Sequence, residues 1–286
     1  MPEGDSIFRA ARALHKALSG KSITRFESMF PALTRVADDR AIVGRTVDAV
    51  AARGKHVLMH LSGGLTLHTH MRMNGSWHLY RPGEPWRRPA RDMRILLETP
   101  TAVAIGFNVP IAEFLTDRDL ARHPALRALG PDLLAGAGSA GQTHGQPAFD
   151  RSEALRRLRQ QSGGAIGDAL LDQRVVAGIG NIFKSEVLFL ARIDPFATVA
   201  SLSDEQLGRV LDIAREQLAA NVMTPSQTLS RARGIRTTRS LDPRATLWVY
   251  GRSGQPCRRC GATIQARKTG LDARLTYWCP VCQTRA

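Results

Sequence analysis

The four cysteines of the chain fall in two pairs of the form Cys-x-x-Cys, Cys257 with Cys260 and Cys279 with Cys282. Four thiolates at this spacing satisfy tetrahedral zinc, with the two pairs on opposing β-turns of one ribbon. Disulfides are the alternative, but the chain shows no export signal and we expect a reducing compartment. Four protein ligands leave no open position for water or substrate. We therefore predict one structural Zn²⁺ in a C-terminal zinc ribbon.

A second candidate for chemistry is the N-terminal pair Pro2 and Glu3. A small second residue permits removal of the initiator methionine, which leaves Pro2 with a free secondary amine. An α-amine titrates near ~7.7–8.0, so a useful fraction is unprotonated at neutral pH. Such an amine can attack a sugar carbon and form an iminium, as lysine does with carbonyl substrates. Glu3 beside it could donate a proton. Taken alone, proline at this position usually has no function.

A third candidate is the turn that runs from Ala177 to Ile182 and reads Ala-Gly-Ile-Gly-Asn-Ile. Glycines before a helix let backbone N–H groups approach a phosphate, and the positive end of the helix dipole favours the anion. An ordinary corner between two helices is the simpler interpretation of the turn alone. Beside a basic zinc ribbon, the turn becomes a candidate clamp for a DNA backbone.

The charge of the chain favours a polyanionic partner. Among 286 residues, Lys+Arg number 40 and Asp+Glu 25, a formal net charge of +15. Residues 231–286 carry twelve Lys and Arg against two acids, Asp242 and Asp272. Neutralised phosphates release counterions, so such a region binds nucleic acid in a salt-dependent way without sequence preference. A merely solvated basic face is the alternative, and a membrane surface is a weaker candidate than nucleic acid. The longest apolar run, 102–115, is too short to span a membrane.

The elements that must position these residues change along the chain. Apolar residues at helical spacing predict a helix over Ser6–Leu18, with Asp5 or Ser6 as its N-cap. Short strand-like runs between glycines and prolines then predict hairpins and a sandwich or barrel. These runs are Val47–Ala51, Val57–Leu61, Leu65–Thr69, Trp77–Tyr80, Ile95–Glu98 and Ala102–Phe107.

The second half of the chain has a helical period. The uncharged, glycine-rich residues that follow position 134 predict an interdomain linker over 135–149. A capping box, Ser203 with Gln206, opens the last of four predicted helices. The Arg-rich segment 229–245 has no periodicity and is predicted to be a loop. The four helices are Arg151–Gln161, Ala165–Gln173, Ile182–Ala191 and Ser203–Asn221.

Five motifs occur in an order typical of one family. They read MPEGD, RGKHVL, LTLHTHMRMNGSW, LLDQRVVAGIGNIFKSE and RLTYWCPVCQ, and they extend over nearly the whole chain. In these motifs the sequence resembles the bacterial formamidopyrimidine-DNA glycosylase/endonuclease VIII family. The MPEG opening and the WCPVCQ ending look more like the endonuclease VIII branch, whose members remove oxidised pyrimidines.

The resemblance implies an α+β multidomain fold. It comprises an N-terminal helix plus β-sandwich (1–134), the linker (135–149), a helical helix–two-turn–helix domain (150–245) and the zinc ribbon (246–286). We expect DNA to lie in the basic cleft between the two main domains.

The resemblance also implies site residues. Pro2 would attack C1′ of the damaged nucleotide, Glu3 would assist opening of the sugar ring, and Lys55, on a strand over Lys55–Leu61, would contact a phosphate beside the lesion. Asn181 and Arg274 would hold the same stretch of DNA. The alternative for Lys55 is an ordinary surface lysine.

A flipped base leaves a gap in the stack, which the resemblance assigns to Met73, flanked by Arg72 and Asn74. The alternative for Met73 is core packing. Glu186 matches an acidic position near the family's active site, but could equally cap or pair locally. Ser6 is a departure, because many members carry an acid there, and this puts lyase efficiency in doubt.

We therefore predict a bifunctional DNA glycosylase/AP lyase of base excision repair that excises oxidised bases, pyrimidines first. The Pro2 iminium would lead to β-elimination, with a δ step able to follow. One rival is a catalytically weak protein that binds lesions or AP sites, and another is a zinc-ribbon RNA-binding protein. We expect a cytoplasmic, nucleoid-associated monomer whose partner is damaged DNA and not a membrane.

Overall fold

The computed structural model describes residues 2–136, 147–223, 235–270 and 273–284. The chain divides into two compact units. One is built mainly from residues 1–128, and the other mainly from 129–134, 148–224 and 233–286. Residues 129–134 pack with the helices of the second unit, where Gly130 N donates to Gln173 O at 2.8 Å.

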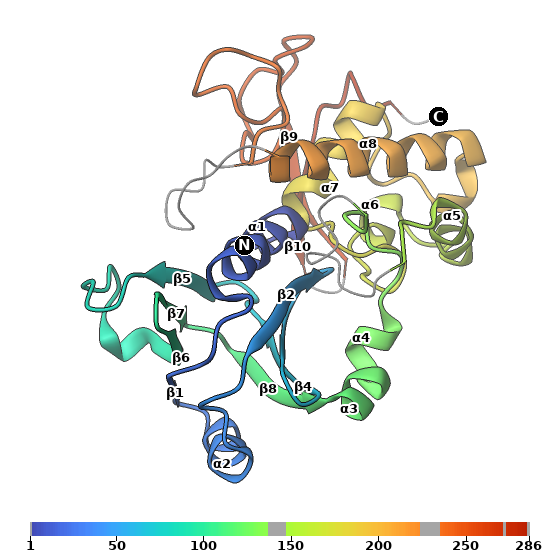
Figure 1. The fold of residues 1–286 in the computed structure, drawn as a ribbon. Coiled ribbons are helices and arrows are strands. Elements are labelled where there is room, and N and C mark those ends of the chain that lie inside the picture. The colour runs from blue at the N-terminus through green and yellow to red at the C-terminus, as the bar shows by residue number, and fades with distance from the viewer. Residues whose placement is uncertain (1, 137–146, 224–234, 271–272, 285–286) are drawn as a thin grey trace. The chain divides into compact units, whose positions relative to one another are not determined.

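The first unit is a sandwich of two antiparallel sheets (Figure 1). All six runs predicted as strands are strands, and most of the residues in these runs are buried. The first sheet has the order β1 (Arg25–Ser28), β6 (Met93–Thr99), β7 (Ala102–Phe107), β5 (Ser76–Tyr80). The second has the order β2 (Val47–Arg53), β3 (His56–Leu61), β4 (Leu65–His70), β8 (Ile111–Thr116).

Two edge strands and three helices of this unit were not predicted. The strands β1 and β8 lie at sheet edges and bury few residues, so their sequences lack a continuous apolar face. Helix α2 starts with a proline in its first turn, where a missing N–H costs nothing. The three helices are α2 (Pro31–Arg40), α3 (Asp117–Arg122) and α4 (Pro124–Ala128).

Helix α1 (Gly4–Leu18) starts two residues earlier than predicted, and its N-cap is Glu3 rather than Asp5 or Ser6. Glu3 has extended backbone angles, φ −114° and ψ 179°, and Ser6 lies within the first turn. The N-terminal N–H groups of a helix lack partners inside it, and here Ser6 Oγ takes the N–H of Glu3 instead. The short side chain of Ser6 therefore supports the helix start without being its cap.

Helix α1 packs along β2 in the opposite direction (Figure 1). Near the end of the helix, Ser19 Oγ donates to Asp48 O at 2.9 Å. One turn earlier in the helix, and later in the strand, Val50 N donates to His15 Nδ1 at 3.2 Å. The helix and the strand are therefore antiparallel, and the N-terminus of α1 lies towards the C-terminal end of β2.

The second unit contains four α-helices among its described residues. The predicted helices 151–161, 182–191 and 203–221 are confirmed, and Ser203 and Gln206 exchange the hydrogen bonds of a capping box at 2.7 and 3.1 Å. The predicted helix 165–173 is wrong in length, because it ends at Ala169 and the chain turns there. The helices are α5 (Arg151–Gln160), α6 (Ile166–Ala169), α7 (Asn181–Ala191) and α8 (Asp204–Met223).

A two-stranded ribbon packs against α7. Its strands are β9 (Gln265–Thr269) and β10 (Arg274–Trp278). Phe189 of α7 shares a buried cluster with Val249, Ile264 and two of the cysteines. The apolar side of α7 thus forms the base on which the cysteine-bearing segments rest.

Glu186 joins α7 to the segment that leads into the ribbon. Its side chain is fully buried, and it accepts hydrogen bonds from the backbone N–H groups of Trp248, Val249 and Tyr250 at 2.8–2.9 Å and from the hydroxyl of Thr237. Burial raises the pKa of this carboxyl, and the four hydrogen bonds oppose that rise. The sequence left open whether Glu186 has a local structural role, and these contacts give it one.

We expect Glu186→Ala to lower the free energy of unfolding of the second unit by about 2–3 kcal/mol, since three backbone N–H groups lose their acceptor. Urea unfolding followed by the fluorescence of the tryptophans would measure the change. The exposed Glu216 on α8 offers a matched control, and Glu216→Ala should leave the transition in place. Equal transitions for the two variants would contradict the anchoring role.

Candidate functional site

Hydrogen bonds fix the N-terminal residues of the first unit. Pro2 is partly exposed, whereas Glu3 is fully buried. Ser6 Oγ accepts the N–H of Glu3 at 2.8 Å and donates to the carbonyl of Glu3 at 2.9 Å. The residue next to Pro2 is thus held by both of its backbone polar groups, which restricts where the terminal amine can lie.

A second carboxylate lies in the same helical turn. Asp5 is fully buried and forms an ion pair with Arg9 at 2.8 Å. Its other oxygen, Oδ1, has no hydrogen-bond partner among the described residues. Burial raises the pKa of Asp5, and the charge of Arg9 opposes that rise. From the sequence, Asp5 was predicted only as a possible N-cap of the helix, and the departure from the family was noted only at Ser6.

Lys55 lies in the tight turn between β2 and β3, not on a strand as predicted. The strand β3 begins at His56, and Gly54 supplies the turn with a positive φ of 58°. From His15 back to Gly4, helix α1 rises about 16 Å. From Val50 to Arg53, where β2 ends, the extended chain advances about 10 Å in the same direction, and Lys55 follows two residues later in the turn. The antiparallel packing of α1 on β2 therefore brings Pro2 and Lys55 to one end of the sandwich.

The loop between β4 and β5 projects from the same end. His70, the last residue of β4, pairs in register with His56, which follows Lys55. Met73 is 57% exposed, so the core-packing alternative is wrong. Gly75 N donates to Met71 O at 2.9 Å, and a Cβ on Gly75 would come within 2.7 Å of that oxygen. The close turn therefore requires glycine and holds Met73 outward between Arg72 and Asn74.

His70 is a residue of this site that the sequence analysis missed. Its Nδ1 accepts the N–H of Arg72 at 3.2 Å. Burial lowers its pKa to about 4, with the charges of His68, Lys55 and Arg72 acting in the same direction. His70 is therefore neutral at pH 7. The signal was present, because LTLHTH ends directly before the loop that carries Met73.

In the second unit, the N-terminus of α7 contacts the ribbon strand β10. Asn181 Nδ2 donates to Leu275 O at 2.8 Å, and Lys184 Nζ donates to the hydroxyl of Thr276 at 2.7 Å. Arg274, the first residue of β10, directly precedes Leu275. The structure thus brings two predicted phosphate-binding residues, Asn181 and Arg274, together within one unit.

The turn before α7 is shaped by its glycines and by Gln173. Gly178 has a positive φ of 109°, and Gly180 is the N-cap of α7. Gln173 spans the turn: Oε1 accepts the N–H of Gly178 at 3.1 Å, and Nε2 donates to the carbonyl of Ile179 at 3.0 Å. The side chain of Gln173 therefore fixes the turn. The positive end of the α7 dipole lies at Asn181.

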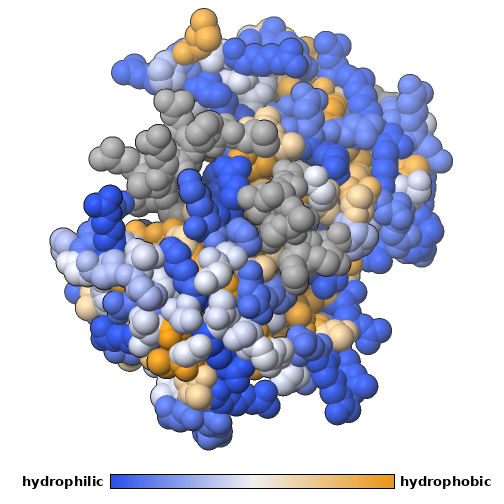
Figure 2. All heavy atoms as spheres, in the orientation of Figure 1, coloured by the Kyte–Doolittle hydropathy of each residue, from blue (hydrophilic) through white to orange (hydrophobic). Residues whose placement is uncertain are grey.

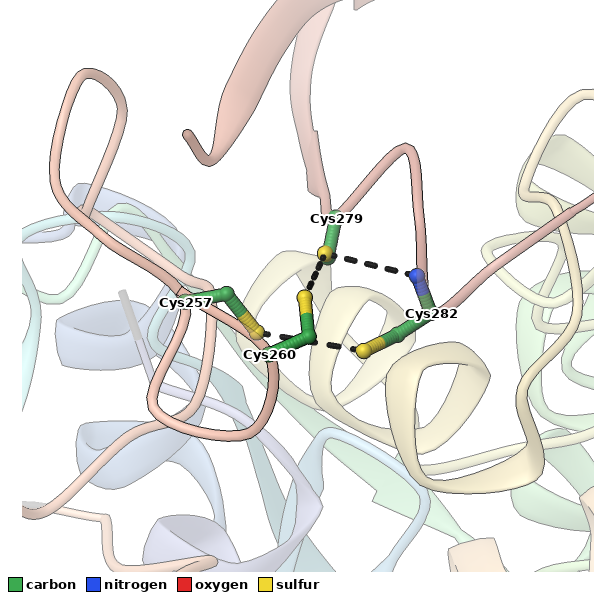
Figure 3. A group of neighbouring side chains, drawn as sticks. All are labelled: Cys257, Cys260, Cys279 and Cys282. Atoms are coloured by element: carbon green, nitrogen blue, oxygen red, sulfur yellow. Dashed lines mark hydrogen bonds between the residues drawn. The ribbon is translucent and has the colours of Figure 1, made fainter. Parts of the chain in front are cut away.

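The four cysteine side chains point toward one another (Figure 3). The sulfurs of Cys257 and Cys282 are 4.0 Å apart and those of Cys260 and Cys279 are 3.5 Å apart. Backbone N–H groups donate to two of the sulfurs, at Cys257 and Cys279, each at 3.4 Å. Zn–S bonds of about 2.3 Å at a tetrahedral centre need sulfurs about 3.8 Å apart. The four cysteines therefore fit one zinc ion with little movement.

The surface is strongly polar. Hydrophilic residues cover most of the face drawn in Figure 2, with apolar residues in smaller areas. This agrees with the net charge of +15. Among the described residues, no helix combines the length and the apolar composition that a membrane span needs.

Comparison with known proteins places three family models along the chain. The formamidopyrimidine-DNA glycosylase N-terminal domain matches residues 1–108, and the H2TH domain of the same glycosylase matches 141–232. The zinc finger found in FPG and IleRS matches residues 254–285, so the ribbon binds one structural zinc.

Two relatives match almost the full length of the chain. The chain is 40% identical to "Probable endonuclease 8 2" of Streptomyces coelicolor, over 99% of this chain and 94% of that protein. It is also 40% identical to "DNA-(apurinic or apyrimidinic site) lyase Nei2" of Mycolicibacterium smegmatis, over 99% of each chain.

Among solved structures, the fold is similar to that of Lactococcus lactis Fpg. A complex of that protein with DNA containing an oxidised pyrimidine matches with a TM-score of 0.80 and 25% identity. A complex with DNA containing an abasic site matches with a TM-score of 0.79 and 25% identity. In both cases 99% of this chain and 100% of the other are covered.

We expect Cys282→Ser to lose one equivalent of zinc and to unfold the ribbon, since the metal is what holds the two cysteine-bearing segments together. Zinc content by mass spectrometry and protection of the ribbon from proteolysis would measure both changes. The strands of the first unit contain no cysteine, so their unfolding transition should stay in place. A variant that keeps its zinc would contradict the four-cysteine site.

Proposed function

Because the chain belongs to the formamidopyrimidine-DNA glycosylase family, with endonuclease 8 proteins as its curated relatives, we propose that Pro2 is its nucleophile and oxidised pyrimidines its main substrates. The protein is a DNA glycosylase and AP lyase of base excision repair. The observation that supports the proposal for Pro2 is the antiparallel packing of α1 on β2, from which we infer that Pro2 lies at the end of the sandwich that carries Lys55 and the loop of Met73.

The chemistry follows from a free amine at Pro2. Its nitrogen attacks C1′ of the damaged nucleotide, and the base leaves with the electron pair of the glycosidic bond and takes up a proton. Glu3 gives a proton to the sugar-ring oxygen as the C1′–O bond breaks, which leaves a C1′ iminium. The iminium acidifies the C2′ proton. Loss of that proton expels the 3′ phosphate, and a second elimination can expel the 5′ phosphate.

Cations and helix ends would hold the DNA strand around the reacting sugar. Lys55 reaches one phosphate from the β2–β3 turn, and Arg274 reaches another from β10. Asn181 has a second amide hydrogen besides the one donated to Leu275, and this hydrogen can reach a phosphate at the N-terminus of α7. Such contacts position the duplex and read no sequence, which suits an enzyme that searches all DNA.

Met73 would fill the space that the flipped nucleotide leaves. An exposed, flexible apolar side chain held at the tip of a tight turn suits insertion between bases. Arg72 and Asn74 flank it and offer hydrogen-bond donors to the unpaired base opposite the lesion. Arg72 has a positive φ of 43°, a strained conformation that persists only where the surrounding turn enforces it.

Two further points concern substrate and assembly. Lactococcus lactis Fpg, of similar fold, binds DNA containing an oxidised pyrimidine, which supports the proposed lesion class. A single chain carries the nucleophile, the phosphate-binding residues and the zinc ribbon. We therefore propose that it acts as a monomer on nucleoid DNA.

Borohydride trapping of the untagged protein tests the nucleophile. A covalent adduct should form on oligonucleotides with an AP site and on those with an oxidised pyrimidine, because borohydride reduces the iminium to a stable amine. Pro2→Ala should lose the adduct on the oxidised pyrimidine, because excision uses the secondary amine of proline as nucleophile. On the AP site it should lower the yield, because the primary amine of alanine can still form an imine with the aldehyde. Gel electrophoresis of the trapped complex measures the yield.

The controls separate the alternatives. Mass spectrometry must first show that the protein begins at Pro2. An adduct on the AP site alone would restrict the protein to lyase chemistry and overturn the proposed lesion. Tight binding to lesion DNA with no adduct on either substrate would favour the rival, a protein that only binds lesions. Preference for RNA would contradict both.

We expect Arg274→Ala to weaken binding to all duplexes equally and to reduce the slope of log K against log salt by about one, because one phosphate contact is lost. Fluorescence anisotropy at four salt concentrations measures the slope. Arg209, exposed on α8, provides the control, and Arg209→Ala should keep the slope of the parent protein. A slope unchanged in Arg274→Ala would remove this residue from the interface.

A further inference from the structure

Half of the eight histidines of the chain gather at one place in the first unit. His56, His68 and His70 come from the adjacent strands β3 and β4, and His123 comes from the corner between α3 and α4. Ring centroids of neighbouring pairs are 4.7–5.0 Å apart. The proposed chemistry at Pro2 assigns a role to none of these four imidazoles.

Two of the imidazoles converge on one carboxylate. Glu113 on β8 lies directly opposite His68 on β4 in the sheet register. Glu113 Oε1 is 2.9 Å from His68 Nδ1 and 3.0 Å from His123 Nε2. All three ligand atoms lie within 4.8 Å of one another. The side chains are exposed by 2% at His68, 16% at His123 and 41% at Glu113, so an ion can enter from the Glu113 side.

This donor set suits zinc. Two imidazole nitrogens and one carboxylate oxygen are a known ligand combination for Zn²⁺ with a fourth position left for water. Bonds of about 2.0–2.1 Å at a tetrahedral centre place ligand atoms about 3.3 Å apart. The observed separations of 2.9 and 3.0 Å therefore need to open by a few tenths of an ångström. Glu113 provides the negative charge that the ion requires.

A second histidine supports the first ligand. His56 Nδ1 is 2.8 Å from His68 Nε2, and both rings are nearly fully buried. Without metal, His68 Nδ1–H donates to Glu113 and His68 Nε2 accepts from His56. With metal on Nδ1, the proton of His68 moves to Nε2 and the direction of the bond to His56 reverses. Ligating histidines commonly have such a partner on their other nitrogen.

Metal binding at His123 would break one weak hydrogen bond. Its Nδ1 accepts the N–H of Leu126 at 3.3 Å, and Nε2 carries the proton that Glu113 accepts. Metal on Nε2 moves this proton to Nδ1, so the contact with Leu126 is lost. One long hydrogen bond is weak beside a set of metal–ligand bonds, so its loss does not prevent metal binding.

We propose that His68, Glu113 and His123 bind one divalent transition-metal ion, zinc first, at a site separate from the four-cysteine ribbon. The ion joins the edge strand β8 to β4 and to the α3–α4 corner. It thereby fixes the strand that ends at His70, next to the loop of Met73. The site lies wholly in the first unit and does not depend on the proposed role of Pro2.

Metal analysis of the full-length protein tests the site. After dialysis against a small excess of zinc and removal of free ions, the parent protein should hold two equivalents of zinc. His123→Asn and Glu113→Gln should each hold one. His60, whose Nδ1 contacts Thr66 at 3.0 Å on the same sheet, is the matched control, and His60→Asn should keep two.

Cobalt substitution distinguishes the two sites. Four thiolates around Co²⁺ give intense sulfur-to-metal charge-transfer absorption, whereas two nitrogens and an oxygen do not. The second equivalent of cobalt should add weak visible bands without further charge-transfer absorption, and His123→Asn should lose only those bands. One equivalent in the parent protein at tenfold metal excess would overturn the proposal and leave the cluster as a hydrogen-bonded network.

Discussion

The antiparallel packing of α1 along β2 is the constraint on which the proposed active site depends. A terminal amine is tethered on one side only, so the chain cannot position it by a loop closed at both ends. The contacts of His15 with Val50 and of Ser19 with Asp48 fix the C-terminal end of the helix on β2. The two hydrogen bonds between Ser6 and Glu3 then fix its first turn. The location of Pro2 therefore follows from contacts that extend over the whole of α1.

In the second unit, different interactions hold Arg274 in place. A short ribbon with two strands has too small a core to hold Arg274 in place alone, and two-stranded hairpins are marginal in water. Zinc holds the cysteine-bearing segments, and α7 holds the ribbon through Asn181 and Lys184. Glu186, on the same helix, holds the segment that enters the ribbon. One helix thus orients both the glycine turn and the strand of Arg274.

The sequence predicted those features that depend on local pattern. Three such features require only nearby residues, and each is present. They are the cysteine spacing, the six strands and the capping box at Ser203. Features that depend on tertiary contacts were missed. Lys55 was predicted on a strand because the turn has only two residues and β3 begins directly after it, at His56. The edge strand β8 and the cluster around Glu113 arise from pairing across the sheet, which no single segment encodes.

The acids of the first helical turn show how position and chemistry are linked here. Ser6 lacks the carboxylate expected from the family, yet Asp5, one residue earlier, is buried in the same turn. A carboxylate near a helix N-terminus is favoured by the dipole, but burial raises its pKa and weakens its charge. Arg9 restores part of that charge through an ion pair at 2.8 Å. The hydroxyl of Ser6 forms hydrogen bonds with the backbone of Glu3. In this turn Asp5 therefore provides the carboxylate, and Ser6 positions Glu3.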